Sequence, residues 1–192
     1  INEIKKEFRG KLPEIIIVND GSTDNFISEK KKLASFIKVI SHENNLGKCM
    51  AMLTGVKASK NKVICVMDGD GQNPPYEVKR MIDYWHQVPK DFKDFVLICG
   101  NRKNRQDTFI KRVSSKIANS VRRFILNDDC NDTACALKVF NKKDYLKINY
   151  FKNMHRFLPA LFKINSGKIF NLPVDDRKRT KGISKYSFHN RF

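Results

Sequence analysis

Short apolar runs alternate with longer amphipathic stretches along this chain, and this alternation restricts the possible folds more than any other feature. Runs rich in Ile and Val predict buried strands at residues 14–19, 37–41, 62–67 and 95–99. The stretches between them predict helices at residues 25–35, 47–59 and 76–87. This order implies an α/β fold, with a mainly parallel sheet covered by helices on both faces.

The rest of the chain continues the pattern. It predicts a long helix at 109–126, a strand at 134–140, helices at 141–148 and 155–164, and a strand at 168–174 before a basic tail. No repeat, linker or low-complexity segment interrupts it, so we expect residues 1–192 to form one domain. The chain begins with Ile rather than Met and stops without a terminating signal, which indicates a fragment of a longer protein.

The net charge of +18 is the strongest compositional signal. It suits nucleic acid, an anionic membrane surface or phosphorylated small molecules. No zinc finger, RNP motif or clear helix-turn-helix is readable, and the Lys residues are spread out, so we expect no nucleic-acid partner. The five cysteines form no CxxC pair, which is typical of reduced core cysteines in the cytosol. No apolar run approaches the roughly 20 residues of a spanning helix, and no signal peptide is visible.

Polar clusters follow three of the predicted strands. Asn-Asp-Gly-Ser-Thr-Asp occupies 19–24, Asp-Gly-Asp-Gly-Gln occupies 68–72 and Gly-Asn-Arg occupies 100–102. In open α/β sheets, ligands bind beyond the carboxyl ends of the strands. We therefore expect a binding site at that edge of the sheet.

Asp68 and Asp70 place two carboxylates close together at a strand end. Mg²⁺ and Mn²⁺ favour oxygen ligands and are commonly shared between one or two carboxylates and substrate phosphates. Gly69 and Gly71 let the backbone turn sharply between them. The alternative is an Asp-Gly turn that only caps the following helix.

Two further segments are candidates for binding a nucleotide. Asp20, Gly21 and Ser22 combine hydrogen-bonding groups for a base or ribose with a flexible turn, although an ordinary turn would look the same. Lys48 opens a helix whose free N–H groups suit an anion. Its segment, Asn45-Leu46-Gly47-Lys48, lacks the second Gly and the spacing of a Walker A loop, which excludes a P-loop NTPase.

Two basic segments are candidate phosphate contacts. Arg102 precedes the long predicted helix, and residues 179–186 pack cations around Gly and Ser, a composition suited to a pyrophosphate. A solvated basic loop and a frayed tail are the respective alternatives.

Taken in order, these segments resemble the inverting family-2 glycosyltransferases of GT-A fold. The similarity is closest to the branch that charges polyprenyl phosphates, which includes dolichol-phosphate mannosyltransferase and bacterial undecaprenyl-phosphate glycosyltransferases. It extends over nearly the whole chain and rests on residues 18–24, 45–48, 67–75 and 182–186.

The resemblance implies roles for individual residues. It gives Asp20 a contact to the nucleotide base and assigns Asp68 and Asp70 to the site of the metal and the diphosphate. It places Asp132 near the acceptor, as a catalytic residue together with Asp70. The implied segment that closes over the phosphates contains Arg179, Ser184 and Lys185, and the implied acceptor side contains His155 and Arg156.

The implied reaction is direct displacement at the anomeric carbon of a UDP- or GDP-sugar, with Mg²⁺ or Mn²⁺ offsetting charge on the leaving diphosphate. A phosphate acceptor is already ionised, so Asp132 would orient it, whereas a hydroxyl acceptor would need Asp132 as a base. The basic surface favours a polyprenyl phosphate at the cytoplasmic face of a membrane, because anionic lipid attracts Lys and Arg.

The chain departs from the family's pattern in three places. The family's first strand, with its Pro-x-Tyr-Asn-Glu type motif, should precede Ile1, and the membrane helices of many members should follow the domain. Asp176 stands where this branch often has His. Two alternatives remain: a soluble transferase acting on a polysaccharide or glycan hydroxyl, and an inactive nucleotide-sugar-binding remnant.

Overall fold

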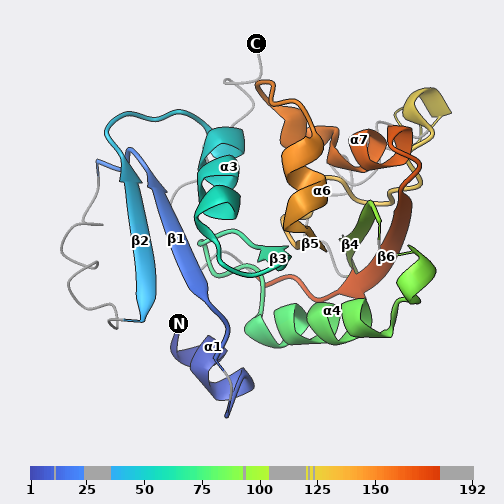
Figure 1. The fold of residues 1–192 in the computed structure, drawn as a ribbon. Helices are drawn as coiled ribbons and strands as arrows, with labels where there is room; N and C mark the ends of the chain where they lie inside the picture. The colour runs from blue at the N-terminus through green and yellow to red at the C-terminus, as the bar shows by residue number, and fades with distance from the viewer. Residues whose placement is uncertain are drawn as a thin grey trace.

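The computed structural model describes residues 1–10, 12–23, 36–92, 94–103, 120, 122 and 124–177. Its helices are α1 (Asn2–Glu7), α3 (Lys48–Ala58), α4 (Pro75–Gln87), α6 (Lys142–Lys147) and α7 (Leu158–Ile164), with 3-10 turns at η1 (Lys90–Phe92) and η2 (Met154–Arg156). Its strands are β1 (Ile15–Asp20), β2 (Ile37–His42), β3 (Val63–Val66), β4 (Val96–Arg102), β5 (Lys138–Asn141) and β6 (Lys168–Val174) (Figure 1). The predicted helix at 25–35 and most of the one at 109–126 lie outside the described residues.

The strands form two sheets. β1 and β2 pair in parallel, with Ile15 opposite Ile37. The second sheet has the order β3-β5-β4-β6, in which β5 runs antiparallel to both neighbours and β4 runs parallel to β6. The predicted α/β class is confirmed, but the expected mainly parallel sheet is corrected to a two-stranded parallel sheet and a four-stranded mixed sheet.

The reversed direction of β5 follows from where the chain enters it. β4 ends at Arg102, and after residues 103–137 the chain enters β5 at Lys138, which lies opposite both Val66 of β3 and Cys99 of β4. A strand that begins at the edge where its neighbour ends must run the other way. As a result, the first residue of β5 joins the carboxyl ends of β3 and β4, where the polar motifs lie.

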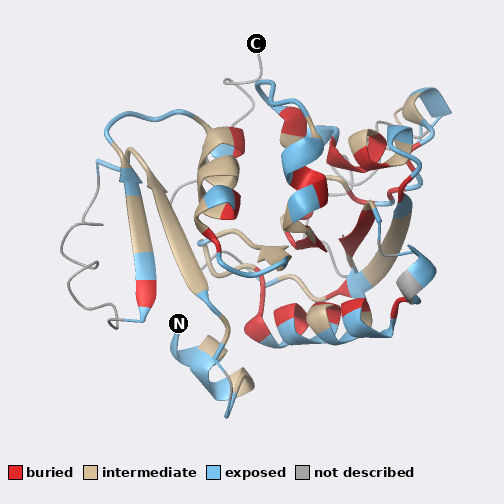
Figure 2. Cartoon of the chain, in the orientation of Figure 1, coloured by how far each residue is buried: buried red, intermediate tan, exposed pale blue. Residues whose placement is uncertain are grey.

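Helices cover both faces of the mixed sheet, as the sequence predicted, and the buried positions of β4 alternate between them. Leu97 and Cys99 pack with residues of α3, α6 and α7, whereas Val96 and Ile98 pack with residues of α4. Figure 2 shows this burial concentrated between α4 and the α6 and α7 helices. Among the described residues, no helix combines the length and apolar character needed to cross a bilayer.

Several boundaries differ from those expected. The predicted helix at 155–164 is divided into η2 and α7, because Pro159 lies in the first turn of α7, where a missing N–H costs nothing. The predicted strand at 134–140 begins only at Lys138, since a turn from Asp132 to Cys135 precedes it. β4 extends three residues beyond the predicted strand and ends at Arg102. Helix α1 was not predicted.

Candidate active site

The segment after β1 and the segment before α3 are held together by Asp20. Its carboxylate accepts hydrogen bonds from the backbone N–H groups of Leu46 at 2.9 Å and Gly47 at 2.8 Å, and it lies 2.8 Å from Nδ1 of His42. Burial acts to raise the pKa of Asp20, but these hydrogen bonds outweigh it and hold the pKa below its usual value. Asp20 is thus fixed as a carboxylate that joins two motif segments.

Gly21 allows these segments to approach closely. Its φ is +65°, and a Cβ built on it would lie 2.6 Å from the backbone of Asn44 and Asn45. Any other residue would strain the backbone and push the segments apart. The next residue, Ser22, donates its backbone N–H to the side chain of Asn19 at 3.1 Å, which closes the turn.

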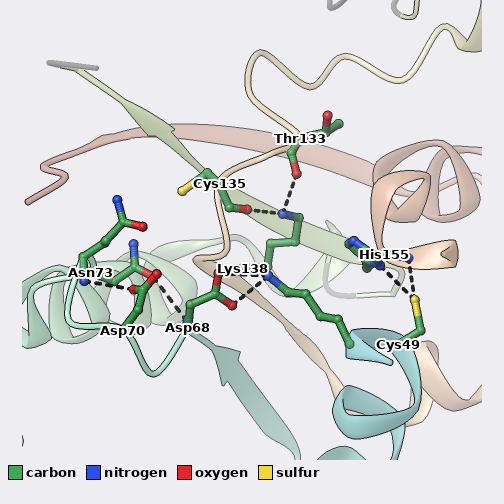
Figure 3. A network of polar contacts seen from close by, with 10 residues as sticks. Cys49, Asp68, Asp70, Asn73, Thr133, Cys135, Lys138 and His155 are labelled. Carbon is green, nitrogen blue, oxygen red and sulfur yellow. Dashed lines mark hydrogen bonds and ion pairs between the residues drawn. The ribbon is translucent and has the colours of Figure 1, made fainter. Parts of the chain in front are cut away.

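Lys48 connects the first turn of α3 to the loop after β3. Its ammonium group donates to both carboxylate oxygens of Asp68, at 2.7 and 3.0 Å. In the same loop, Asp70 accepts the backbone N–H of Gln72 at 3.1 Å, and Asn73 accepts the N–H of Asp68 at 3.4 Å (Figure 3). The two carboxylates of the metal prediction therefore lie on one short loop, next to a cation from another element.

A second ion pair joins Arg102, the last residue of β4, to Asp132 in the loop before β5. Two guanidinium nitrogens of Arg102 donate to the two carboxylate oxygens of Asp132, at 2.7 and 3.0 Å. Burial disfavours the charged guanidinium, but the bond to Asp132 outweighs this and raises the pKa of Arg102. Asp176, beyond β6, lies 3.9 Å from the same guanidinium. Asp132 itself is buried.

The end of β6 also reaches the loop that carries Asp70. The backbone N–H of Arg177 donates to the carbonyl of Gln72 at 2.9 Å, and the Gln72 side chain donates to the carbonyl of Arg177 at 3.4 Å. Contacts thus run from Asp20 through Lys48, Asp68 and Gln72 to the segment that precedes the predicted closing loop. Arg179, Ser184 and Lys185, assigned to that loop, lie outside the described residues.

His155 reaches this edge from η2. Its Nδ1 lies 2.9 Å from the sulfur of Cys49, the second residue of α3, and its backbone N–H donates to the same sulfur at 3.3 Å (Figure 3). Arg156, the other acceptor-side prediction, is exposed. Burial and then the charges of Lys48 and Arg156 lower the pKa of His155 to about 4.

Three side chains at this edge were not predicted to act there: His42, Cys49 and Lys138. Lys138 is buried and donates to the carbonyls of Thr133 and Cys135. A Lys within the apolar run Leu137-Lys138-Val139-Phe140 was a visible signal, because Lys is almost never buried without partners. No comparable signal marks His42 or Cys49, whose partners lie on other elements.

The predicted core role of the cysteines agrees with the structure. All five are free; Cys65 is partly buried and the other four are buried. Burial raises the pKa of Cys65 to about 12 and that of Cys135 to about 11, so both remain protonated at neutral pH.

The donor set at Asp68 and Asp70 suits a hard divalent cation. The described residues contain no group of three or more His, Cys, Asp or Glu side chains that could hold a metal without other ligands. Two carboxylates completed by water and diphosphate oxygens are the usual arrangement for Mg²⁺ and Mn²⁺. The ammonium group of Lys48 contacts both oxygens of Asp68, so a metal ion at this carboxylate would have to displace Lys48, whose partly exposed side chain can move to another partner.

Comparisons with known proteins agree with this geometry. Residues 1–148 match the family Glycosyl transferase family 2. The dodecaprenyl-phosphate galacturonate synthase of Rhizobium johnstonii is 30% identical over 186 residues, which cover 93% of this chain and 54% of that protein. The chain therefore spans about half the length of this curated relative.

Solved structures show the same fold at low sequence identity. Glucosyl-3-phosphoglycerate synthase from Mycobacterium tuberculosis, in complex with Mn²⁺, UDP-glucose and glycerol 3-phosphate, superposes with a TM-score of 0.66 at 16% identity, over 95% of this chain and 66% of that one. Its complex with Mg²⁺ and UDP gives a TM-score of 0.67 at 15% identity, over 94% and 66%. The family match, the curated relative and the shared GT-A fold lead to one conclusion: the chain belongs to glycosyl transferase family 2.

Proposed function

We propose that this chain carries the catalytic site of an inverting glycosyltransferase that moves a sugar from a UDP-sugar to a polyprenyl phosphate. The donor site rests on the ion pair between Lys48 and Asp68, which joins residues 45–48 to the loop after β3. Asp20 joins the same residues to the segment after β1, so three motif segments meet at this edge. The Mycobacterium tuberculosis enzyme of the same fold was solved with UDP-glucose, which supports UDP as the nucleotide.

The donor nucleotide would lie along this edge. Gly21 and Ser22 offer a turn that Asp20 fixes, and Lys48 offers a half-exposed cation for the diphosphate. Asp68 and Asp70 would hold Mg²⁺ or Mn²⁺, which supplies Lewis-acid stabilisation of the negative charge that develops on the leaving diphosphate. With a metal ion at Asp68, the ammonium group of Lys48 would pair with a phosphate oxygen of the donor instead of with Asp68. The segment with Arg179, Ser184 and Lys185 remains our candidate for closing over the phosphates.

The state of Asp132 supports a phosphate acceptor over a hydroxyl. Asp132 is the candidate general base, yet both of its oxygens accept from the guanidinium of Arg102, and the residue is buried. Both oxygens of Asp132 are thus already engaged by the guanidinium, and a hydroxyl acceptor would have to compete with Arg102 for them. A phosphate nucleophile is already ionised at neutral pH and needs no base, so Asp132 would help to position groups near the acceptor.

The acceptor side also carries a surface suited to lipid. Tyr150, Phe151 and Phe157 are each about two-fifths exposed, and the rings of Phe151 and Phe157 lie 6.2 Å apart. Lys152 and Arg156 are exposed beside them in the chain. Aromatic rings and cations together favour the interface of an anionic bilayer. The curated relative is named for a polyprenyl phosphate product, which supports the same acceptor class.

A radiolabelled sugar-transfer assay tests this proposal. The full-length enzyme is given a UDP-sugar, or in a parallel series a GDP-sugar, together with one acceptor at a time: polyprenyl phosphate, free polyprenol, glycerol 3-phosphate or soluble oligosaccharide. We expect label on polyprenyl phosphate, and we expect EDTA and Asp70→Asn each to reduce transfer by at least tenfold, since loss of the cation removes several kcal/mol of charge stabilisation.

Asp83→Asn is the matched control, because Asp83 forms an exposed pair with Lys79 on α4 and has no place in the proposed site. It should transfer sugar at the wild-type rate. Label on oligosaccharide alone would replace the acceptor with a glycan hydroxyl, and label on glycerol 3-phosphate alone would replace it with a soluble phosphate. Transfer with GDP-sugar only would overturn the assignment of UDP. No transfer at all would favour the alternative that the protein is an inactive nucleotide-sugar-binding remnant.

A further inference from the structure

Cys49 and His155 form a bridge between two elements that each carry part of the proposed site. Cys49 directly follows Lys48 in the first turn of α3, and His155 lies in η2 on the acceptor side. The sulfur lies 2.9 Å from Nδ1 of the imidazole and 3.3 Å from the backbone nitrogen of the same residue. Figure 3 shows the two side chains pointing toward each other. Cys49 is buried, so water does not compete for these contacts.

The two contacts determine where the thiol proton lies. The backbone N–H of His155 can only donate, so it uses the sulfur as an acceptor. Sulfur is a weak acceptor and would have to accept a second hydrogen bond if Nδ1 carried a proton. The better arrangement is for the S–H group to donate to an unprotonated Nδ1. The neutral imidazole then carries its proton on Nε2.

The surroundings of His155 keep the ring neutral. It is half-buried, and the cations Lys48, Arg156 and Lys138 lie around it, with Asp68 as the opposing negative charge. Burial comes first among the causes that lower the pKa of His155 to about 4, and the three cations follow. A neutral ring with a defined tautomer can donate one hydrogen bond from Nε2 without adding charge to the site.

We propose that Cys49 is a positioning residue that holds Nδ1 of His155, so that Nε2–H is presented as a donor to an oxygen of the acceptor substrate. The inference rests on the proposed function, because it places the Nε2–H group on the acceptor side. Cys49 itself touches no substrate. Its effect is to fix the tautomer and the ring orientation of His155, as carboxylates and carbonyls do for histidines in many active sites.

The tautomer can be measured without turnover. Long-range ¹H–¹⁵N spectra of the chain at pH 7 should show His155 with the proton on Nε2, and His155→Gln identifies its signals among those of the four histidines. Cys49→Ala should give a mixture of both tautomers, whereas Cys49→Ser should retain the wild-type tautomer because a hydroxyl can also donate. Val56→Ala, another buried position of α3, controls for loosening of the helix.

Steady-state kinetics then test the consequence. Cys49→Ala should lower kcat/KM for the acceptor roughly threefold to tenfold, the value of one neutral hydrogen bond, with the KM of the UDP-sugar unchanged. Cys49→Ser should recover most of this loss, and Val56→Ala should show none. A proton on Nδ1 in the wild type, a tautomer that Cys49→Ala leaves unchanged, or equal acceptor kinetics in all variants would each overturn the inference. A wild-type enzyme that transfers nothing refutes the proposed function instead, and the spectra then report on the bridge alone.

Discussion

The ion pairs Lys48–Asp68 and Arg102–Asp132 lie at the same edge of the fold and both have a shortest N–O distance of 2.7 Å. They differ in exposure. The side chains of Lys48 and Asp68 are 38% and 41% exposed, against 17% and 3% for Arg102 and Asp132. An exposed pair contributes about 0–1 kcal/mol, whereas removing one partner of a buried pair costs roughly 3–5 kcal/mol. The first pair can therefore exchange a partner for a ligand at little cost, and the second cannot.

This difference extends to the regions that carry the two pairs. The loop at 128–135 has a second buried pair, Arg122–Asp128, and the buried Lys138 donates to two of its carbonyls. The loops around Lys48 and Asp68 are held mainly by hydrogen bonds between backbone and carboxylate, such as those of Asp20. We infer that the loops around Lys48 and Asp68 can rearrange around a ligand more easily than the loop at 128–135, which buried ion pairs hold in place.

The largest expected effect is on the buried pair. Asp132→Asn should lower the free energy of unfolding by about 3 kcal/mol, because Arg102 would be left largely buried with Asp176, 3.9 Å away, as its remaining carboxylate partner among the described residues. Urea denaturation followed by circular dichroism measures this change. The double variant Arg102→Met/Asp132→Leu should recover part of the loss, since it removes the buried guanidinium together with the carboxylate that it faces, at the cost of the longer contact to Asp176. Equal stability of wild type and Asp132→Asn would show that the Arg102–Asp132 pair contributes no more to the free energy of unfolding than the exposed Lys48–Asp68 pair.

An intermediate effect is expected at Asp20, and it should depend on pH. The folded pKa of Asp20 lies below its unfolded value, so its stabilisation is present above the unfolded pKa and is lost as the pH falls through the folded pKa. Asp20→Asn should cost about 1.5 kcal/mol at pH 7, the lower end for hydrogen bonds to a charged group. The difference in the free energy of unfolding between wild type and Asp20→Asn should disappear as the pH falls below about 4.

Urea midpoints of wild type and Asp20→Asn, measured at several pH values, show how this difference in stability depends on pH. Asp83→Asn, at an exposed pair on α4, should show no such convergence. If the gap between wild type and Asp20→Asn stayed constant down to pH 3, the charge on Asp20 would not be the source of its stabilisation.

The smallest effect on stability is expected at the exposed pair. Lys48→Ala should change the free energy of unfolding by no more than about 0.5 kcal/mol, because both side chains are well solvated. Its affinity for UDP should nevertheless fall by roughly tenfold, since a hydrogen bond from a cation to a phosphate is worth about 1.5–3 kcal/mol. Calorimetric titration with UDP and with uridine separates the diphosphate contact from the nucleoside. Equal losses for both ligands would argue against a phosphate contact.

Much of the site could be located from the sequence because it lies where strands end. Asp20, Asp68 and Arg102 were expected at the carboxyl edge, and the structure places them there, at or just beyond the ends of β1, β3 and β4. Such positions can be read from local patterns, since a run of apolar residues followed by Gly and Asp marks both the strand and its end. The order of the motifs then indicated the family, which the comparisons confirm. The roles of the individual residues remain predictions.

Other features depended on partners far apart in the chain. Nothing local to Cys49 indicates that it meets His155, 106 positions away. Likewise, the direction of β5 depends on the edge at which the chain returns, which hydrophobic periodicity does not record. The prediction of one mainly parallel sheet was wrong for this reason. For the same reason, the sequence did not indicate that Lys138 begins a central strand at the site.

Local patterns were sufficient to predict the α/β class, the position of the polar motifs beyond the strands and the family to which the chain belongs, because these depend on short-range periodicity and on residue type. Local patterns did not indicate which charges are buried, that Arg102 pairs with Asp132, or that Cys49 contacts His155. Burial and pairing are properties of the packed chain and depend on residues far apart in the sequence. An Asp is well exposed beside a Lys in one loop and buried beside an Arg in another, and only the neighbours brought by folding distinguish Asp68 from Asp132.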